Sequence, residues 1–363
     1  MTTREAPPKG LKLPVRAHPP AGSIVSSAPA FTRTRVLGVD LGRSAVRRLR
    51  NRSVTNLLRM GHCAPTVMQT MLDASGTETC WLVKLTAGLP GGIGNTGGEC
   101  GAVTSLLILL GLRRGRRAMR DGLPTVVDEG HELIRRFTNR NGTIFCRDIR
   151  GHARLPLRCI GVVRQSPELC AQTLSTDCAG AIPRESREAY RRLCAPCEAV
   201  GFHCAHAVFQ NLRSTIPVTE ELLDGTSAFM GGTVFMGLTC SAFTAGVMAI
   251  GVALGEIEDS RLRVLRMIGI MAAGGNAFAD DLNAFNRVMN LGHRLSAWFT
   301  AEFGSTQCRA ITKCDFSTAS GVTRYVDGGG VARCEAIARQ VASRVEGIIE
   351  RARGGLRVAR DEM

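Results

Sequence analysis

The stretch "GGECGAVTSLLILLG" (97–111) places a cysteine between a run of glycines and an unbroken apolar segment. The stretch "GLTCSAFTAGVMAIG" (237–251) repeats this arrangement, with Cys240 in the place of Cys100. Glycine accepts a left-handed backbone, so such a loop can pass close to another group. The apolar run is long enough for a buried helix, whose first turn offers unpaired backbone N–H groups. We therefore expect each cysteine to lie at the start of a buried helix.

Two further blocks of sequence recur in the same order. "GHCAPTVMQ" (61–69) returns as "FHCAHAVFQ" (202–210), and "GHELIRRFTNRNGTIFCRDI" (130–149) returns as "GHRLSAWFTAEFGSTQCRAI" (292–311). Self-similarity of this kind is the signature of a repeat architecture. The chain is therefore a tandem duplication.

The repeats are expected to span residues 44–180 and 181–363. A weaker match sets "PELCAQ", around Cys170, against "VARCEA", around Cys334. The second repeat also carries extra sequence around "MAAGGNAFADDLNAFNRV" (271–288), which predicts a lengthened helix pair or a lid.

The composition and the periodicity predict an all-α fold. Of the 363 residues 44% are hydrophobic but only 5% are aromatic, which suits closely packed helices better than a β-sandwich. Apolar residues recur at helical spacing near residues 44–60, 63–74, 100–119, 126–138, 163–175, 186–199, 204–213, 240–254, 259–273, 280–301 and 331–353. We expect two homologous helical-bundle repeats packed as a pseudo-dimer. Residues 1–43, rich in proline and serine, are expected to form a disordered basic tail.

The net charge of +15 favours an acidic partner. The arginine-rich runs 33–52 and 113–120 lack the interleaved aromatic residues that stack on bases, so we expect no specific nucleic acid. The uncharged segment 225–255 is long enough to span a bilayer. Its counterpart in the first repeat contains Glu99, so membrane association is open but not favoured. The N-terminus lacks the apolar core of a signal peptide, which predicts a cytoplasmic protein.

The chain contains 14 cysteines, and in a reducing compartment so many thiols indicate metal ligation or redox chemistry. Four recur in each repeat: Cys63, Cys100, Cys146 and Cys170 in the first, and Cys204, Cys240, Cys308 and Cys334 in the second. Four thiolates suit an iron–sulfur cluster, [2Fe–2S] or [4Fe–4S], with zinc as the alternative. The ligand sets would hold one cluster per repeat or share one between the repeats. Without a counterpart in the other repeat, Cys80, Cys159, Cys178 and Cys314 are expected to be core filler.

The order of these motifs resembles the redox-active protein family C_GCAxxG_C_C, whose helical members have four characteristic cysteines. The first repeat carries the resemblance in "HCAPTV", "CGAVTSLLILLG", "GTIFCRDI" and "LCAQ", and the second in "HCAHAV", "CSAFTAGVMAIG", "GSTQCRAI" and "RCEA". It departs from the family at Ser241, where the family has glycine, and it leaves Cys159 and Cys170 as alternatives for the last cysteine of the first repeat. The resemblance implies a redox or cluster-binding role, in electron transfer or redox sensing with a redox partner protein.

Other residues are candidates for supporting roles. Gly97, Gly98 and Gly237 would let the backbone approach a cluster closely, and His62 and His203 would hydrogen-bond around it. The sequence "CAPC" (194–197) offers an alternative, a thiol–disulfide oxidoreductase that uses Cys194 and Cys197. A helical binding module stabilised by zinc is a further alternative. No motif of a substrate-converting enzyme is found, so no catalytic residue is assigned.

Overall fold

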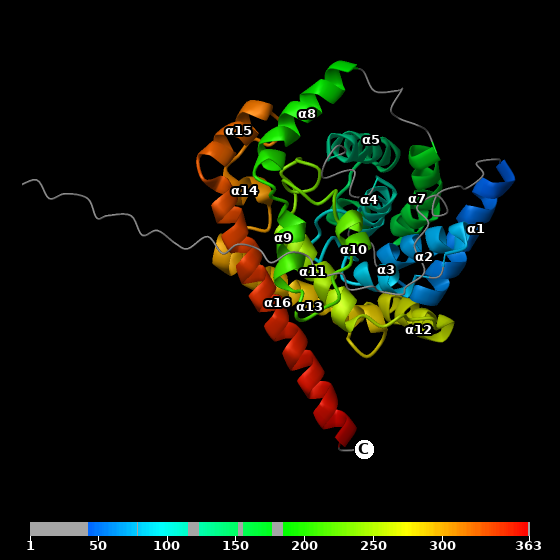
Figure 1. Ribbon diagram of the computed structural model, residues 1–363. Helices are drawn as coiled ribbons and strands as arrows, with labels where there is room; N and C mark the ends of the chain where they lie inside the picture. Colours follow the sequence, from blue (N-terminus) through cyan, green and yellow to red (C-terminus); the bar gives the residue numbers. More distant parts are fainter. Residues whose placement is uncertain (1–42, 78, 115–122, 152–154, 176–183, 362–363) are drawn as a thin grey trace, which may run out of the picture. The chain divides into compact units, whose positions relative to one another are not determined.

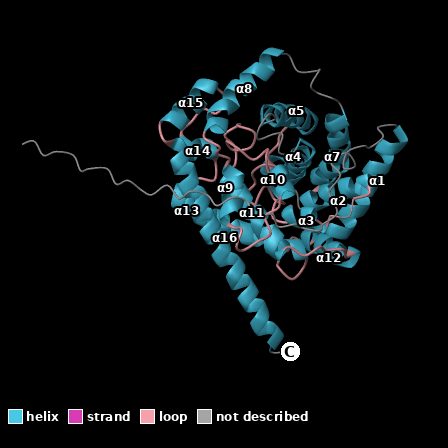
Figure 2. Ribbon diagram, viewed as in Figure 1, coloured by secondary structure: helices cyan, strands magenta, loops and turns pink. Residues whose placement is uncertain are grey.

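The structure, a computed structural model, describes residues 43–77, 79–114, 123–151, 155–175 and 184–361 (Figure 1). Within these ranges every regular element is a helix, and the only β-pairing is two isolated bridges (Figure 2). The prediction of an all-α protein is confirmed. Apart from Arg43, the predicted N-terminal tail lies outside the described residues, as does Cys178.

The first repeat runs through α1 (Arg43–Met60), α2 (Cys63–Ser75), α3 (Cys80–Leu85), α4 (Gly101–Arg114), α5 (Leu123–Asn141), α6 (Cys146–Arg150) and α7 (Leu157–Ser175). The second runs through α8 (Arg184–Ala199), α9 (Cys204–Asn211), α10 (Glu220–Gly225), α11 (Ser241–Leu254), α12 (Arg261–Ala272), α13 (Ala284–Phe303), α14 (Cys308–Thr312), α15 (Ala319–Asp327) and α16 (Gly330–Asp361).

Every long helix expected from the periodicity is present. Two parts of the prediction need correction. The helix α7 begins at Leu157 rather than near residue 163, and the short helices α3, α6, α10, α14 and α15 were not predicted. Five to nine residues give too few turns for a helical period to show in the sequence.

The helices α4 and α11 form the core, as the opening motifs predict. Residues 101–112 of α4 and 241–251 of α11 are all buried. A helix that is apolar on every side is stable only when other helices surround it. Here α4 packs against α2, α5, α7 and α10, and α11 packs against α3, α9, α13 and α16.

Two glycines at equivalent positions of the repeats allow each core helix to contact the other repeat closely. A Cβ atom on Gly111 of α4 would lie 2.4 Å from the carbonyl oxygen of Asp224, in α10 of the other repeat. A Cβ atom on Gly251 of α11 would lie 2.3 Å from the carbonyl oxygen of Lys84, in α3. Each core helix therefore touches a short helix of the opposite repeat at a position that only glycine allows.

The glycine loops make a second reciprocal contact. Gly94, in the loop of the first repeat, packs against Gly292 of α13, where an added Cβ atom would lie 2.9 Å from the backbone. In the second repeat Val234 packs against Gly130 of α5, and the ring of His131 hydrogen-bonds to the Val234 carbonyl at 2.6 Å. The equivalence of these contacts confirms the pseudo-dimer.

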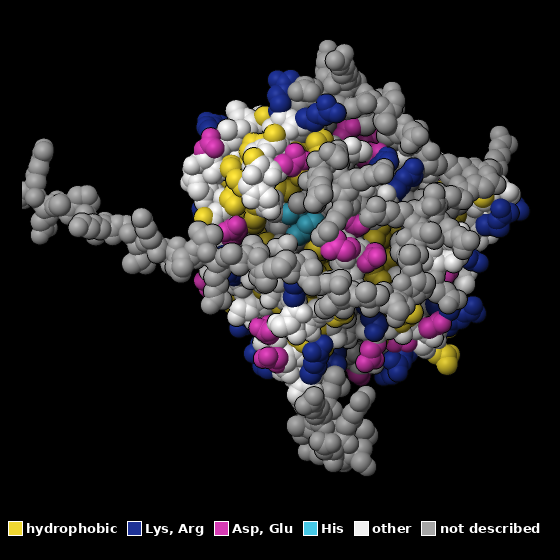
Figure 3. Space-filling view, viewed as in Figure 1, with side chains coloured by type: hydrophobic (Ala, Val, Ile, Leu, Met, Phe, Trp, Pro, Cys, Tyr) yellow, Lys and Arg dark blue, Asp and Glu magenta, His cyan; other side chains and the backbone are white. Residues whose placement is uncertain are grey.

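None of the described helices combines the length and the apolar character that crossing a membrane requires. On the face that Figure 3 shows, basic and acidic side chains are interspersed.

Candidate thiol centres

Six of the eight recurring cysteines lie where helices begin. They open α2, α6, α9 and α14 (Cys63, Cys146, Cys204 and Cys308) or directly precede α4 and α11 (Cys100 and Cys240). A helix start offers unpaired N–H groups and the positive end of the helix dipole, both of which favour a thiolate. The local structure thus suits sulfur chemistry before any tertiary contact is considered.

Backbone hydrogen bonds join the second and third cysteines of each repeat. The N–H of Cys146 donates to the carbonyl of Gly98 at 2.7 Å, and that of Cys100 donates to Ile144 at 2.7 Å. In the second repeat the N–H of Cys308 donates to Leu238 and that of Cys240 to Thr306, at 2.7 and 2.8 Å. Two segments far apart in sequence are therefore fixed side by side in the same way in both repeats.

We call Cys63, Cys100, Cys146 and Cys159 the first thiol cluster. An added Cβ atom on Gly101, the residue after Cys100, would lie 3.0 Å from the sulfur of Cys63, so the two cysteines are neighbours. Hydrogen bonding with Cys100, together with burial, raises the pKa of Cys63 well above its usual value. The same hydrogen bonding lowers the pKa of Cys100 against the effect of burial, and the backbone N–H groups of Ala102 and Val103 contribute to the lowering. The pair thus contains one sulfur that favours the thiolate and one that favours the thiol.

The other two thiols of the first thiol cluster are held neutral. Burial, with the charge of Cys100, raises the pKa of Cys146 to about 12 and that of Cys159 to about 11. Cys63 and Cys159 are half-buried, whereas Cys100 and Cys146 are buried. Solvent therefore reaches this cluster at Cys63 and Cys159.

We call Cys204, Cys240, Cys308 and Cys334 the second thiol cluster. All four line one enclosed cavity of about 10 Å³, room for roughly one water molecule. Hydrogen bonds from Cys204 and from Tyr325 lower the pKa of Cys334 to about 7, whereas the bond to Cys334 and burial raise that of Cys204. Burial also raises the pKa of Cys240, to about 11, and that of Cys308.

The two clusters pair their thiols differently. The neutral partner is the equivalent cysteine in both repeats, Cys63 or Cys204. Cys63 pairs with Cys100, whereas Cys204 pairs with Cys334, which is not the equivalent of Cys100. The low-pKa sulfur is accordingly buried in the first thiol cluster, at Cys100, and half-buried in the second, at Cys334. The repeats are alike in fold and distinct in chemistry.

The structure places Cys159, and not Cys170, with the other thiols of the first repeat. Cys170 is fully buried farther along α7, and the influences on its raised pKa are burial and Arg113, with no cysteine among them. Cys159 lies in the first turn of α7, as Cys334 lies near the start of α16. The helix α15, inserted between Cys308 and Cys334, lengthens that interval and makes Cys170 look equivalent in the sequence.

The two histidines beside the first cysteines bond away from the thiols. The ring Nε2 of His62 lies 2.7 Å from the amide oxygen of Asn286, and that of His203 lies 3.0 Å from the carbonyl oxygen of Ser227. The Nδ1 of His203 also accepts the backbone N–H of His206 and so caps α9. Burial lowers the pKa of both His62 and His203 to about 4, so both rings are neutral. Their contacts are structural.

The predicted glycines shape the loops beside the clusters. Gly97 and Gly237 have φ of +76° and +68°, and each packs against the Cβ of the arginine that follows the third cysteine, Arg147 or Arg309. Gly98 faces the other repeat, where an added Cβ atom would lie 3.1 Å from the hydroxyl of Thr239.

A buried carboxylate joins the two loops next to the clusters. Glu99 is 1% exposed and accepts hydrogen bonds from the backbone N–H of Thr239 at 3.0 Å and from the hydroxyl of Thr233 at 3.2 Å. The hydroxyl of Thr239 donates to the same carboxylate. Glu99 precedes Cys100 as Thr239 precedes Cys240, so this contact links equivalent positions of the repeats. From the sequence alone Glu99 bears only on the question of a membrane span.

Tyr325 is a neighbour of the second thiol cluster that could not be found from the sequence. Its hydroxyl lies 3.2 Å from the sulfur of Cys334. It belongs to α15, which has no counterpart in the first repeat, so the duplication could not reveal it.

Further thiols surround the second thiol cluster. Cys194 and Cys197 of the "CAPC" motif are buried in α8 and share an apolar core with Cys308 and Cys314. Cys314, expected to be filler, and Cys197 lie close enough to Cys334 for its charge to raise their pKa, though burial is the larger cause. Burial also raises the pKa of Cys194, so neither thiol of the motif is poised as a thiolate.

The insertion of the second repeat packs against the first repeat beside Cys63. Asn283 donates to the carbonyl of Met60 at 3.0 Å, and Phe278 packs against the ring of His62, directly before Cys63. The guanidinium of Arg150 lies over the ring of Phe278, 5.4 Å from its centre. This segment, expected to form a lengthened helix pair or a lid, therefore packs against the other repeat.

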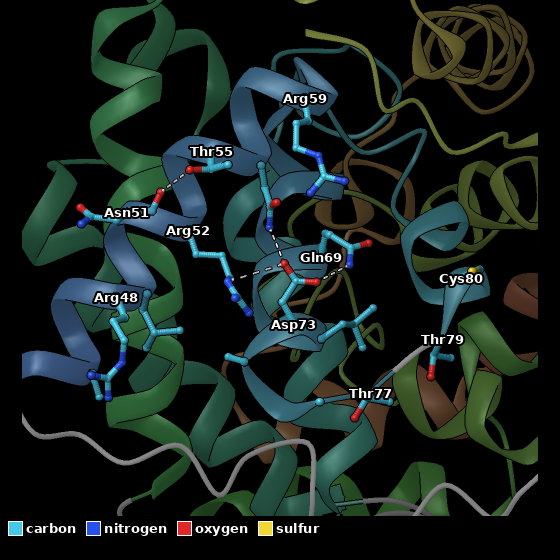
Figure 4. Close-up of a pocket in the computed structure, with 16 residues that line it drawn as sticks. Arg48, Asn51, Arg52, Thr55, Arg59, Gln69, Asp73, Thr77, Thr79 and Cys80 are labelled. Carbon is cyan, nitrogen blue, oxygen red and sulfur yellow. Dashed lines mark hydrogen bonds and ion pairs between the residues drawn. The ribbon is translucent and has the colours of Figure 1, made fainter.

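A groove of about 1130 Å³ lies between α1 and α2, away from the clusters (Figure 4). Arg48, Arg52 and Arg59 line it from α1, and Cys80, which is exposed, lies at its edge. Arg59 is paired with Asp259, and the nearby Asp73 binds Asn56 and Gln69. The groove contains none of the clustered thiols.

These observations define an all-α tandem-repeat protein with one buried cluster of four thiols in each repeat. The chain belongs to the C_GCAxxG_C_C family: the model described as "Putative redox-active protein (C_GCAxxG_C_C)" matches residues 61–179 and 202–348. Neither the curated proteins nor the solved structures gave a match.

Proposed function

We propose that each repeat is a redox centre in which one pair of thiols cycles between dithiol and disulfide. The observation that carries this proposal is the gathering of four thiols in each repeat, within which Cys63 with Cys100 and Cys204 with Cys334 act on each other's pKa. In each pair one pKa is lowered and the other is raised. Such a pair combines a thiolate with a nearby neutral thiol.

The second thiol cluster suits the role of electron donor. The hydrogen bonds that lower the pKa of Cys334 to about 7 favour its thiolate near neutral pH, and the residue is half-buried. The thiolate attacks a disulfide of a partner, forms a mixed disulfide and releases one partner thiolate. Cys204 then loses its proton and attacks the sulfur of Cys334, which releases the second partner thiolate. Two electrons pass to the partner, and the Cys204–Cys334 disulfide remains.

The first thiol cluster suits the reverse reaction. In a Cys63–Cys100 disulfide the accessible sulfur is Cys63 and the better leaving group is Cys100, whose thiolate is stabilised by the N–H groups of Ala102 and Val103. A partner thiolate would attack Cys63 and expel Cys100. The second repeat would then give electrons to a partner and the first would receive them, in electron transfer or redox sensing.

An iron–sulfur cluster is the second candidate, and the recurrence of four thiols in each repeat favours it. The chemistry of the donor set fits, because four cysteine thiolates hold [2Fe–2S] and [4Fe–4S] clusters. The space does not fit, because the cavity between the second four thiols holds about one water molecule. Among the described residues no three His, Cys, Asp or Glu side chains are arranged to hold a metal ion, zinc included.

One preparation separates these candidates. The protein is purified without oxygen, and its absorption spectrum, iron, sulfide and zinc are measured. A sample is then oxidised with glutathione disulfide and mapped by mass spectrometry. We expect a colourless protein with Cys63–Cys100 and Cys204–Cys334 disulfides. Stoichiometric iron and sulfide would replace the disulfide proposal with the cluster, and zinc that is needed for helicity would indicate a structural centre.

A further inference from the structure

Three arginines lie beside the cysteines of the first thiol cluster. Arg147 and Arg150, in α6, and Arg158, in α7, are all exposed. Arg150 and Arg158 are the cations whose charges act on the thiol of Cys159. Within the described part of the chain none of the three forms an ion pair with a carboxylate.

Apolar side chains are exposed between these arginines. Leu157 is 68% exposed and Ile160 is 37% exposed, on either side of Arg158 and Cys159. Large apolar side chains exposed together with unpaired charges mark a contact surface more often than either does alone. We call Arg147, Arg150, Leu157, Arg158 and Ile160 the first rim.

The second thiol cluster lacks such a surface. Arg333 stands beside Cys334, but Glu335 follows directly, and Asp315 lies near Cys314 in the same cluster of side chains. Acidic and basic charges are therefore mixed there. Among the described residues of α6 and the first turn of α7, the exposed acid is Asp148, whose carboxylate accepts a hydrogen bond from Thr143 at 3.1 Å.

We infer that the first rim is the docking surface for an acidic protein that carries a reducing dithiol. The inference rests on the proposed function. Complementary charge would bring the partner to Cys63 and Cys159, and Leu157 and Ile160 would contact an apolar patch beside its dithiol. One partner thiolate attacks the sulfur of Cys63 and expels Cys100 as a thiolate. The second partner thiol loses its proton and attacks the mixed disulfide, which releases Cys63 and leaves the partner oxidised.

Two synthetic peptides test the inference on the full-length oxidised protein. Each carries a dithiol and one leucine; one is rich in glutamate and the other in lysine. The rate at which each reduces the Cys63–Cys100 disulfide is followed by mass spectrometry. Each rate is divided by the rate of the same peptide with a small neutral disulfide, which removes the effect of charge on the peptide's own thiols.

We expect the glutamate peptide to react about tenfold faster at low ionic strength, with the preference lost near ~0.5 M salt. The double change Arg150→Glu and Arg158→Glu should reverse the preference. The control is Arg351→Glu with Arg353→Glu, which changes the net charge equally at the C-terminal end of α16 and should leave the preference intact.

Each remaining result overturns the inference. Equal rates for both peptides, or a control that acts like the rim variant, would show that the rim does not select an acidic partner, while the redox proposal stands. If the Cys63–Cys100 disulfide never forms, or if neither peptide reduces it, the proposed function fails and the inference fails with it.

Discussion

At the scale of single residues, hydrogen bonds and burial decide what each thiol does. Cys334 and Cys240 belong to the same cluster, yet the pKa of one is about 7 and that of the other about 11. The difference arises because Cys334 receives hydrogen bonds from Cys204 and Tyr325, while burial dominates at Cys240. Reactivity therefore follows local contacts rather than the order of cysteines in the sequence.

The change Tyr325→Phe should slow the reaction of Cys334 with iodoacetamide at pH 7 about two- to fivefold. Losing a hydrogen bond to the thiolate raises the pKa, so the labelling profile moves to higher pH and the rate above the new pKa is unchanged. Labelling is followed residue by residue, with exposed Cys80 as the internal control. An unchanged profile would show that Tyr325 does not tune Cys334.

We expect the folded protein to lose stability in mild acid, because two of its histidines are buried in the neutral form. The pKa of His62 and His203 is about 4 in the folded protein, whereas a histidine in the unfolded chain has the ordinary value of 6.5. The unfolded chain binds these protons first, so stability is full above pH 6.5 and falls as the pH drops towards 4. The loss approaches about 3 kcal/mol for each histidine.

Chemical unfolding at a series of pH values between 4 and 7 measures this effect. Replacing His62 by Gln should flatten part of the slope, whereas replacing exposed His293 by Gln should not. A slope that is the same in both variants would contradict the assignment.

At the scale of elements, the duplication explains why so much could be predicted. The long helices and seven of the eight clustered cysteines follow from the recurring blocks, because the same local folding code occurs twice. The eighth, Cys159, could not be found this way, since α15 occurs in one repeat only and shifts the apparent match to Cys170. Tyr325 and the cover over His62 come from segments without a counterpart, so only the tertiary structure reveals them.

Two glycines at helix crossings predict a matched set of stability changes. Gly111→Ala and Gly251→Ala should each destabilise the protein by about 1–3 kcal/mol, because the new methyl group meets a backbone carbonyl that cannot move alone. Gly269→Ala on α12 meets nothing within 4 Å and should stabilise the protein by up to about 1 kcal/mol. Urea unfolding of the three variants tests the set. Equal effects at all three positions would refute the reciprocal packing.

At the scale of the whole molecule, the described residues of both repeats belong to one compact unit, because α4 packs against α10 and α11 packs against α3 of the other repeat. We expect residues 43–180 or 184–363, produced alone, to lose cooperative unfolding, and the two produced together to regain it. Each half lacks the other's cover for its core helix, α4 or α11. Circular dichroism during thermal unfolding is the measurement. A half that unfolds cooperatively alone would show that the repeats are independent.

Under the proposed function, the shared core would place two different redox pairs in one molecule, next to loops that Glu99 joins. The cysteine with the lowered pKa is half-buried in one repeat and buried in the other, which would divide the roles of attacking thiolate and leaving group between them. A duplication that retained both clusters while changing their pairing is what a protein with two redox partners would need.

The most direct test of this account counts thiols across a series of glutathione redox buffers, with each cysteine identified by mass spectrometry. The account predicts the reversible loss of two thiol pairs, Cys63 with Cys100 and Cys204 with Cys334. Replacing Cys100 and Cys334 by Ser should abolish both losses. A thiol count that stays constant from the most reducing to the most oxidising buffer, or disulfides that join other cysteines, would contradict it.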